Sequence, residues 1–91
     1  MTPGAVTKAL PHVSSVVLDD AIALYDSKAH ALVMLNAGAS EVWEGCDGRT
    51  RFDELVERIA RRHDVEEVEV REDVSRTLCE FASLGLVTGT G

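Results

Sequence analysis

Residues 31–48 read ALVMLNAGASEVWEGCDG, and a change of hydrophobic period within this stretch decides the fold. The first part, Ala31–Leu35, is an unbroken apolar run of strand length. Asn36 can then cap a helix at its N-terminus, and Asp47-Gly48 can end that helix. Between them, apolar residues recur at positions i, i+3, i+4 and i+7, as on one helix face: Ala39, Val42, Trp43 and Cys46. The stretch therefore predicts a strand that leads directly into an amphipathic helix.

The residues before this stretch predict two further strands. Val13–Leu18 is rich in β-branched and small residues, and residues 21–25 form a second apolar run. Asp19-Asp20 separates these two runs, and residues 26–28 have the composition of a turn. Three short strands joined by short turns indicate an antiparallel meander.

The residues after the stretch predict two more helices. The first covers residues 51–62 and has helical spacing at Phe52, Leu55, Val56 and Ile59. Thr50, with an Asp three residues later, approximates a capping box for it. The second covers residues 69–83, with Gly85 as its C-cap, and its apolar stripe consists of Val70, Val74, Leu78 and Phe81. Leu86-Val87 can form a closing strand or fold back on the core.

This order of elements predicts an α+β fold in which a three-stranded antiparallel sheet is followed by three helices. Such an arrangement is compatible with a winged helix-turn-helix-like domain, which we expect to span residues 12–87. Residues 1–11 contain two prolines, a glycine and no periodicity, and predict a flexible arm. Residues 88–91 predict a tail.

Composition excludes several classes of protein. The 91 residues include nine Lys and Arg against sixteen Asp and Glu, which gives a net charge of −7. This charge argues against nucleic acid or an anionic membrane surface as a partner. The longest apolar run is far shorter than a membrane span, and residues 1–10 lack a signal-peptide core, so we expect a cytoplasmic protein. A domain this small is marginally stable alone, so we expect a partner or a second copy.

The sequence lacks the groups that catalysis or cofactor binding requires. It has no glycine-rich phosphate loop, and neither Cys46 nor Cys79 has a histidine nearby in sequence. The sequence contains no Cys-x-x-Cys pair of the kind that binds zinc. The carboxylates cluster at residues 66–73, which is typical of a solvated helix start but also suits binding of a basic peptide. We therefore predict a protein that is not an enzyme and holds no metal or cofactor.

The third predicted strand suggests a binding edge. Ala31–Leu35 contains no lysine, proline or bulge that would protect an exposed strand edge. An open edge can accept an extended peptide as an additional strand through main-chain hydrogen bonds. A buried central strand would have the same sequence pattern.

Several short motifs, in this order, resemble the PqqD-like family, which comprises recognition elements for the precursors of ribosomally made, modified peptides. The resemblance covers about residues 16–87 and depends on order and spacing more than on any single motif. Its motifs are Leu35-Asn36, Trp43, Asp47-Gly48, residues 55–59, residues 74–78 and residues 84–87.

The resemblance implies a non-catalytic domain that binds the leader segment of a precursor peptide and presents it to a leader peptidase or another maturation enzyme. The leader would add as a strand to the third strand and lie in a groove against the third helix. The chain looks most like the stand-alone proteins of lasso-peptide clusters, although Leu32 and Val33 replace aromatic residues often found in that group. The implied peptide-binding residues are Ala31, Leu32, Val33, Met34 and Leu35 on the strand, and Val70, Asp73, Val74, Thr77, Leu78 and Phe81 on the helix.

Three alternatives remain open at this point. A winged-helix DNA-binding regulator could use the basic patch formed by Arg58, Arg61 and Arg62, although the net charge opposes it. A small redox protein could use the two cysteines. An unoccupied strand edge could also pair with itself in a homodimer.

Overall fold

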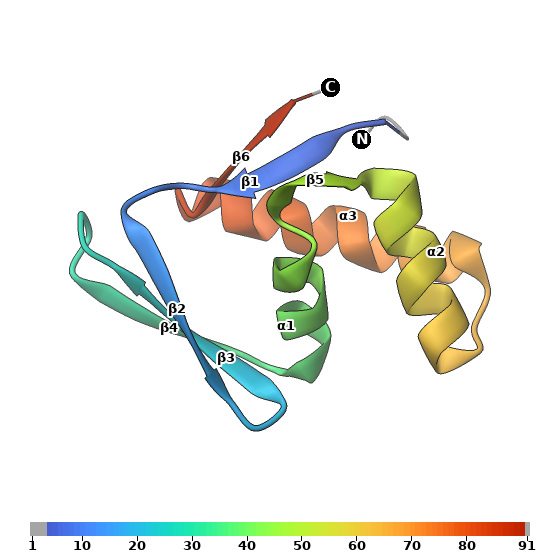
Figure 1. Ribbon diagram of the computed structural model, residues 1–91, viewed down its shortest axis with the longest axis horizontal. Coiled ribbons are helices and arrows are strands. Elements are labelled where there is room, and N and C mark those ends of the chain that lie inside the picture. Colours follow the sequence, from blue (N-terminus) through green and yellow to red (C-terminus); the bar gives the residue numbers. More distant parts are fainter. Residues whose placement is uncertain (1–3, 91) are drawn as a thin grey trace.

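Two small antiparallel sheets and three helices make up residues 4–90, which the computed structural model of the chain describes (Figure 1). In chain order the elements are β1 (Val6–Ala9), β2 (Val13–Leu18), β3 (Ala21–Asp26), β4 (Ala31–Leu35), α1 (Ala37–Glu44), β5 (Asp47–Arg51), α2 (Phe52–His63), α3 (Glu67–Ser83) and β6 (Val87–Thr90). The predicted α+β class is confirmed, but the chain has two sheets where the sequence predicted one.

The first sheet has the strand order β2-β3-β4, as the predicted meander requires. A two-residue turn joins β2 to β3, and its first residue, Asp19, has a φ of 55°. The turn from β3 to β4 is fixed by Asp26, whose carboxylate accepts hydrogen bonds from the backbone N–H groups of Lys28 (2.9 Å) and Ala29 (3.1 Å). The Ala29 bond is the main reason why the pKa of the Asp26 carboxyl lies below its usual value.

The second sheet has the order β5-β1-β6 and was not predicted. Its central strand, β1, lies in the segment that we expected to be a flexible arm, and β6 occupies most of the expected tail. β1 forms because Ala5 and Thr7 are buried and because both of its edges pair, with β5 on one side and β6 on the other. Main-chain bonds from Ala9 N to Cys46 O (3.1 Å) and from Phe52 N to Ala5 O (2.8 Å) extend this pairing.

The helices begin close to the predicted positions, but α1 ends at Glu44, and Asp47-Gly48, which we expected to end it, lie in β5. Asn36 caps α1 as expected, because its side chain accepts a hydrogen bond from Ala39 N at 2.8 Å. The expected cap of α2 at Thr50 is wrong: Arg51 is the N-cap residue, and its N–H donates to Glu54 at 3.2 Å. α3 begins two residues earlier than predicted. It ends at Ser83, and its C-cap residue is Leu84, one residue before the expected cap residue Gly85, which has a φ of 73°.

One hydrophobic core joins the inner face of the first sheet to the three helices. α1 packs against β3 and β4 and also against α3, while α2 packs against α3 and β5. The rings of Trp43 on α1 and Phe81 on α3 meet edge to face, with centroids 5.5 Å apart. Gly45, the C-cap residue of α1, allows Leu55 of α2 to approach closely, because a Cβ at position 45 would lie 2.7 Å from the Leu55 side chain.

Candidate functional site

Strand β4 forms an edge of the first sheet. It pairs with β3 on one side, and among residues 4–90 no strand pairs with its other side. Leu32 and Met34 point away from the core, with 68% and 59% of their surface exposed. Val33 and Leu35 point inward, where Leu35 is buried and Val33 packs at the margin of the core.

The register of the sheet identifies the backbone groups at this free edge. Ser27 N donates to His12 O at 3.0 Å, so Ser27 and His12 form a hydrogen-bonded pair. In an antiparallel ladder every second residue pair is of this kind, so the hydrogen-bonded pairs along β2 and β3 can be counted from this one. On β3, the backbone N–H and C=O groups that point toward β4 are therefore those of Ile22, Leu24 and Asp26. On β4 itself, residues 31, 33 and 35 bond to β3, which leaves the N–H and C=O groups of Leu32 and Met34 directed outward. The edge thus offers two donors and two acceptors to an added strand.

A groove of about 360 Å³ lies between α1, α2 and α3, beyond the point where β4 runs into α1. Its walls are mainly apolar, and its rim is polar. The lining residues are Ala37, Gly38, Glu41 and Val42 from α1, Ile59 and His63 from α2, Val65 from the connector, and Val70, Asp73, Val74 and Thr77 from α3. An extended peptide that follows β4 toward α1 would reach this groove by its α1 wall.

The charges at the rim of the groove are largely paired. Glu41 on α1 accepts one hydrogen bond from Arg62 (3.0 Å) and is bonded to His63 Nε2 (2.6 Å), and both of these partners lie on α2. This pairing ties α1 to α2 on one side of the groove. On the other side, Asp73 forms an exposed ion pair with Arg76 at 3.3 Å. The groove therefore has an apolar floor with carboxylates at two points of its rim, and it suits an apolar side chain more than an anion.

The structure divides the predicted helix residues into two groups. Val70, Asp73, Val74 and Thr77 line the groove together. Val70 and Val74 are buried core residues as well, with 6% and 1% of their surface exposed. Leu78 and Phe81 lie in the same core, each 3% exposed, but they do not line the groove, and Phe81 packs on Trp43. Along α3 these two residues follow the four groove residues, and the helix also packs against α1 and β6.

The groove residues from α1 and α2 were missed by the sequence analysis. Ala37, Gly38 and Glu41 lie in the first two turns of α1, directly after β4. The Asn36 cap was a usable signal, because it places the start of α1 directly at the end of β4. Nothing in the sequence pattern indicated that Ile59 or His63 would reach the same groove.

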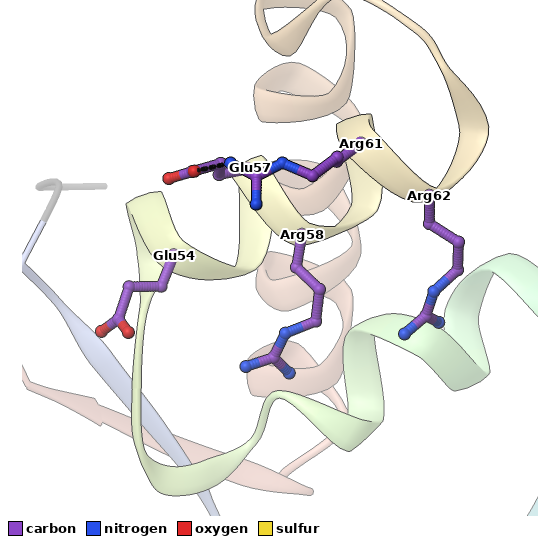
Figure 2. A pocket seen from close by; sticks show the side chains of 5 residues that line it. All are labelled: Glu54, Glu57, Arg58, Arg61 and Arg62. Atoms are coloured by element: carbon purple, nitrogen blue, oxygen red, sulfur yellow. Dashed lines mark hydrogen bonds and ion pairs between the residues drawn. The ribbon is translucent and has the colours of Figure 1, made fainter.

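The basic patch that a DNA-binding regulator could use, Arg58, Arg61 and Arg62, lies on α2 and is partly neutralised. It borders a shallow hollow of about 480 Å³ that Glu54 and Glu57 also line. Figure 2 shows Arg61 turned toward Glu57, with which it forms an ion pair, while Arg58 and Arg62 extend to another side of the helix. Arg62 is bound to Glu41. Of the three arginines of the patch, only Arg58 has no ion-pair partner among residues 4–90, so the patch offers little positive charge to phosphates.

The two cysteines lie in different environments. Cys46 is buried, and desolvation raises the pKa of its thiol to about 12, whereas Cys79 is exposed on α3. Within residues 4–90, no three His, Cys, Asp or Glu side chains are grouped to hold a metal ion. No helix in that part of the chain is long and apolar enough to span a membrane.

The fold of this chain is similar to that of a solved structure of a protein with a bound leader peptide. The chain is similar to a structure titled "TbiB1 in Complex with the TbiA(beta) Leader Peptide", with 25% sequence identity and a TM-score of 0.85. The similarity covers 92% of this chain and 98% of that one. No curated protein matches the sequence.

A protein-family model also matches the sequence. It describes coenzyme PQQ synthesis protein D (PqqD) and matches residues 21–87, from the start of β3 to the start of β6. The matched region contains β4, all three helices and every residue that lines the groove. The chain therefore belongs to the PqqD family, whose members are non-catalytic peptide-binding proteins.

Proposed function

We propose that this protein binds the leader segment of a ribosomally made precursor peptide by strand addition at β4. The free edge of β4 carries this proposal, because it directs the backbone groups of Leu32 and Met34 outward and runs toward the apolar groove. The structure similar to this chain is that of a protein in complex with a leader peptide, which supports the same role here. The bound precursor would then be presented to a maturation enzyme.

Strand addition explains how a single edge can hold a long, variable peptide. Main-chain hydrogen bonds to Leu32 and Met34 supply affinity that depends little on the leader's sequence. Specificity then comes from side chains that enter the groove beside Val70, Val74 and Thr77. The leader must become ordered as it binds, which offsets part of the interaction energy, so we expect a dissociation constant in the nanomolar to micromolar range.

The pathway class is the finer part of the proposal. We expect a lasso-peptide precursor, with a separate leader peptidase as the partner enzyme and with both proteins in the cytoplasm. Trp43 supports this class, because a quinone-cofactor chaperone is expected to have an aliphatic residue there. In this chain Trp43 is buried against Phe81, so the aromatic residue is a part of the core beneath the groove and not a surface feature.

The proposal is tested by titrating a fluorescent leader peptide, encoded by the small open reading frame beside this gene, onto the purified protein and its variant Leu32→Pro. The Leu32 N–H points away from β3, so proline there removes a donor from the free edge and leaves the pairing within the sheet intact. We expect binding at least about tenfold weaker, because an added strand loses a hydrogen bond and meets the proline ring.

Ser15→Pro is the matched control. Ser15 lies on β2, and the same register directs its N–H outward at the opposite edge of the same sheet. Both variants should retain the circular dichroism spectrum of the wild type, and Ser15→Pro should bind the leader within about twofold of it. Equal weakening by both prolines would exclude β4 as the receiving edge. A wild-type protein that does not bind its neighbouring leader at about 100 μM would refute the proposed function.

A further inference from the structure

The first sheet has an outer face that no part of residues 4–90 covers. The helices pack only on its inner face, and the register places every second residue of the three strands on the other. Five residues on this outer face are large, hydrophobic and exposed: Val16, Leu18, Tyr25, Leu32 and Met34. Ser14, Ala21 and Ala23 complete it. We call these eight residues the outer face.

The outer face is uncharged, and its two ends differ in charge: one has two carboxylates, whereas at the other Lys28 lies near Asp26, which is buried on the inner face. None of its eight residues is ionisable near neutral pH, in a chain that is 27% charged. The turn between β2 and β3 places Asp19 and Asp20 at one end, and the turn between β3 and β4 places Lys28 at the other. Strands of six residues separate these ends by roughly 20 Å.

We propose that the outer face is a dimer interface, in which two copies of this chain pack sheet against sheet with their strands antiparallel. A two-fold axis perpendicular to the strands places the Asp20 end of one copy over the Lys28 end of the other. The same axis brings Val16, next to Ala23 and Met34 across the sheet, near the centre of the interface. The face is thus complementary to itself, as a two-fold interface requires.

The size of the face fits a weak dimer. Its five large hydrophobic side chains expose on the order of 500 Å² per copy, so two copies bury about 1,000 Å², near the lower limit for a specific interface. The net charge of −7 on each copy opposes association, although most of the acidic residues lie on the helices. Face-to-face packing leaves the β4 edge free, so each copy keeps its site for an added strand.

Sedimentation equilibrium on the full chain, without leader peptide, tests the proposal between about 5 and 500 μM. We expect a monomer–dimer equilibrium in this range, and Val16→Glu should weaken it at least about tenfold, because a carboxylate would be buried without a partner. Val17→Glu is the matched control. Val17 is even more exposed, at 72% against 59%, but it lies on the other side of the same strand. It should change the dimer affinity less than about threefold.

A charge exchange tests the antiparallel orientation. Asp20→Lys and Lys28→Glu should each weaken the dimer about threefold, and the double variant should restore it, because both ends then change sign together. Failure of the double variant to restore the dimer would exclude this orientation. A chain that stays monomeric at every concentration would overturn the proposal. A dimer that Leu32→Pro or Ser15→Pro disrupts and Val16→Glu does not would be edge-paired, and would overturn it too.

The dimer and the proposed function can fail independently. Val16 lies on β2, two strands away from the β4 edge, so Val16→Glu should bind the fluorescent leader peptide with wild-type affinity. Loss of leader binding in that variant would show that the outer face belongs to the peptide site, and the dimer interface would be refuted.

Discussion

The sheet β2-β3-β4 is built from three consecutive strands joined by short turns, whereas the sheet β5-β1-β6 joins segments from the start, the middle and the end of the chain. In Figure 1 the first sheet extends away from the helices, and the second lies close to both ends of the described chain. The first sheet forms from local contacts. The second can form only after long segments of chain have been brought together.

The difference explains why the proposed site lies on the first sheet. Its pairing is complete within one stretch of chain, so its outer edge can take up and release a peptide without disturbing the chain ends. In the second sheet β1 is the central strand, and both of its edges are occupied by β5 and β6. That sheet closes the domain by holding the segment after α1 and the segment after α3 against the N-terminal strand.

The strongest test of this comparison is Thr7→Pro. Thr7 is buried in the central strand β1, where a proline removes a hydrogen bond from the sheet. We expect the free energy of unfolding to fall by about 3 kcal/mol or more, measured by urea denaturation. Ser15→Pro, at an outer edge of the first sheet, should lower it by less than about 1 kcal/mol. Equal stability of the two variants would mean that residues 6–9 behave as the flexible arm the sequence predicted.

The sequence predicted the first sheet and missed the second for the same physical reason. Val13–Leu18 and Ala31–Leu35 have strand composition and are bounded by turn residues, so local pattern suffices to identify them. β1 is short and carries one buried polar residue, Thr7, where an alternating apolar pattern would be expected. β5 has the sequence DGRTR, which has no strand propensity, and it is extended because it pairs with β1.

The candidate site was predictable to a similar extent. The apolar stripe of α3 could be identified from its spacing, but the sequence could not show which of these core residues also line the groove. Phe81 packs on Trp43 of α1, whereas Val70 and Val74 are buried residues that line the groove. The direction of the backbone groups of Leu32 and Met34 also required the register, which depends on the pairing of all three strands.

A substitution at the start of β5 should have a smaller effect on the free energy of unfolding. The Asp47 carboxylate accepts hydrogen bonds from Thr50 N (2.7 Å) and Arg49 N (2.8 Å), which hold its pKa below the usual value. A lowered pKa stabilises the fold above the unfolded pKa of about 3.9, and this contribution is lost as the pH falls through the folded pKa. Asp47→Ala should therefore lower the free energy of unfolding by about 1 kcal/mol at neutral pH, and by progressively less below about pH 4.

The control for this effect is Asp20→Ala, in the turn of the first sheet. The Asp20 carboxylate accepts no hydrogen bond from residues 4–90, so its removal should change stability by less than about 0.5 kcal/mol at either pH. Urea denaturation at pH 7 and pH 3 measures both variants. A loss in Asp47→Ala that is the same at both values would show that the turn depends on the shape of the side chain and not on its charge.

The last test compares how fast a thiol reagent modifies the two cysteines, and it requires no change in the stability of the fold. Cys46 joins α1 to β5, its carbonyl accepts the hydrogen bond from Ala9 N at the end of β1, and its buried thiol donates to Val42 O at 3.5 Å. We expect this thiol to become exposed when the second sheet opens. Its burial and its raised pKa of about 12 keep it protonated at pH 8, whereas Cys79 is exposed. A thiol reagent should modify Cys46 at least about a hundredfold more slowly than Cys79, and the two should react alike in denaturant. In a Cys79→Ser background, the Cys46 rate should follow global unfolding. A faster rate would mean that the sheet made from distant segments opens while the core and the first sheet remain folded.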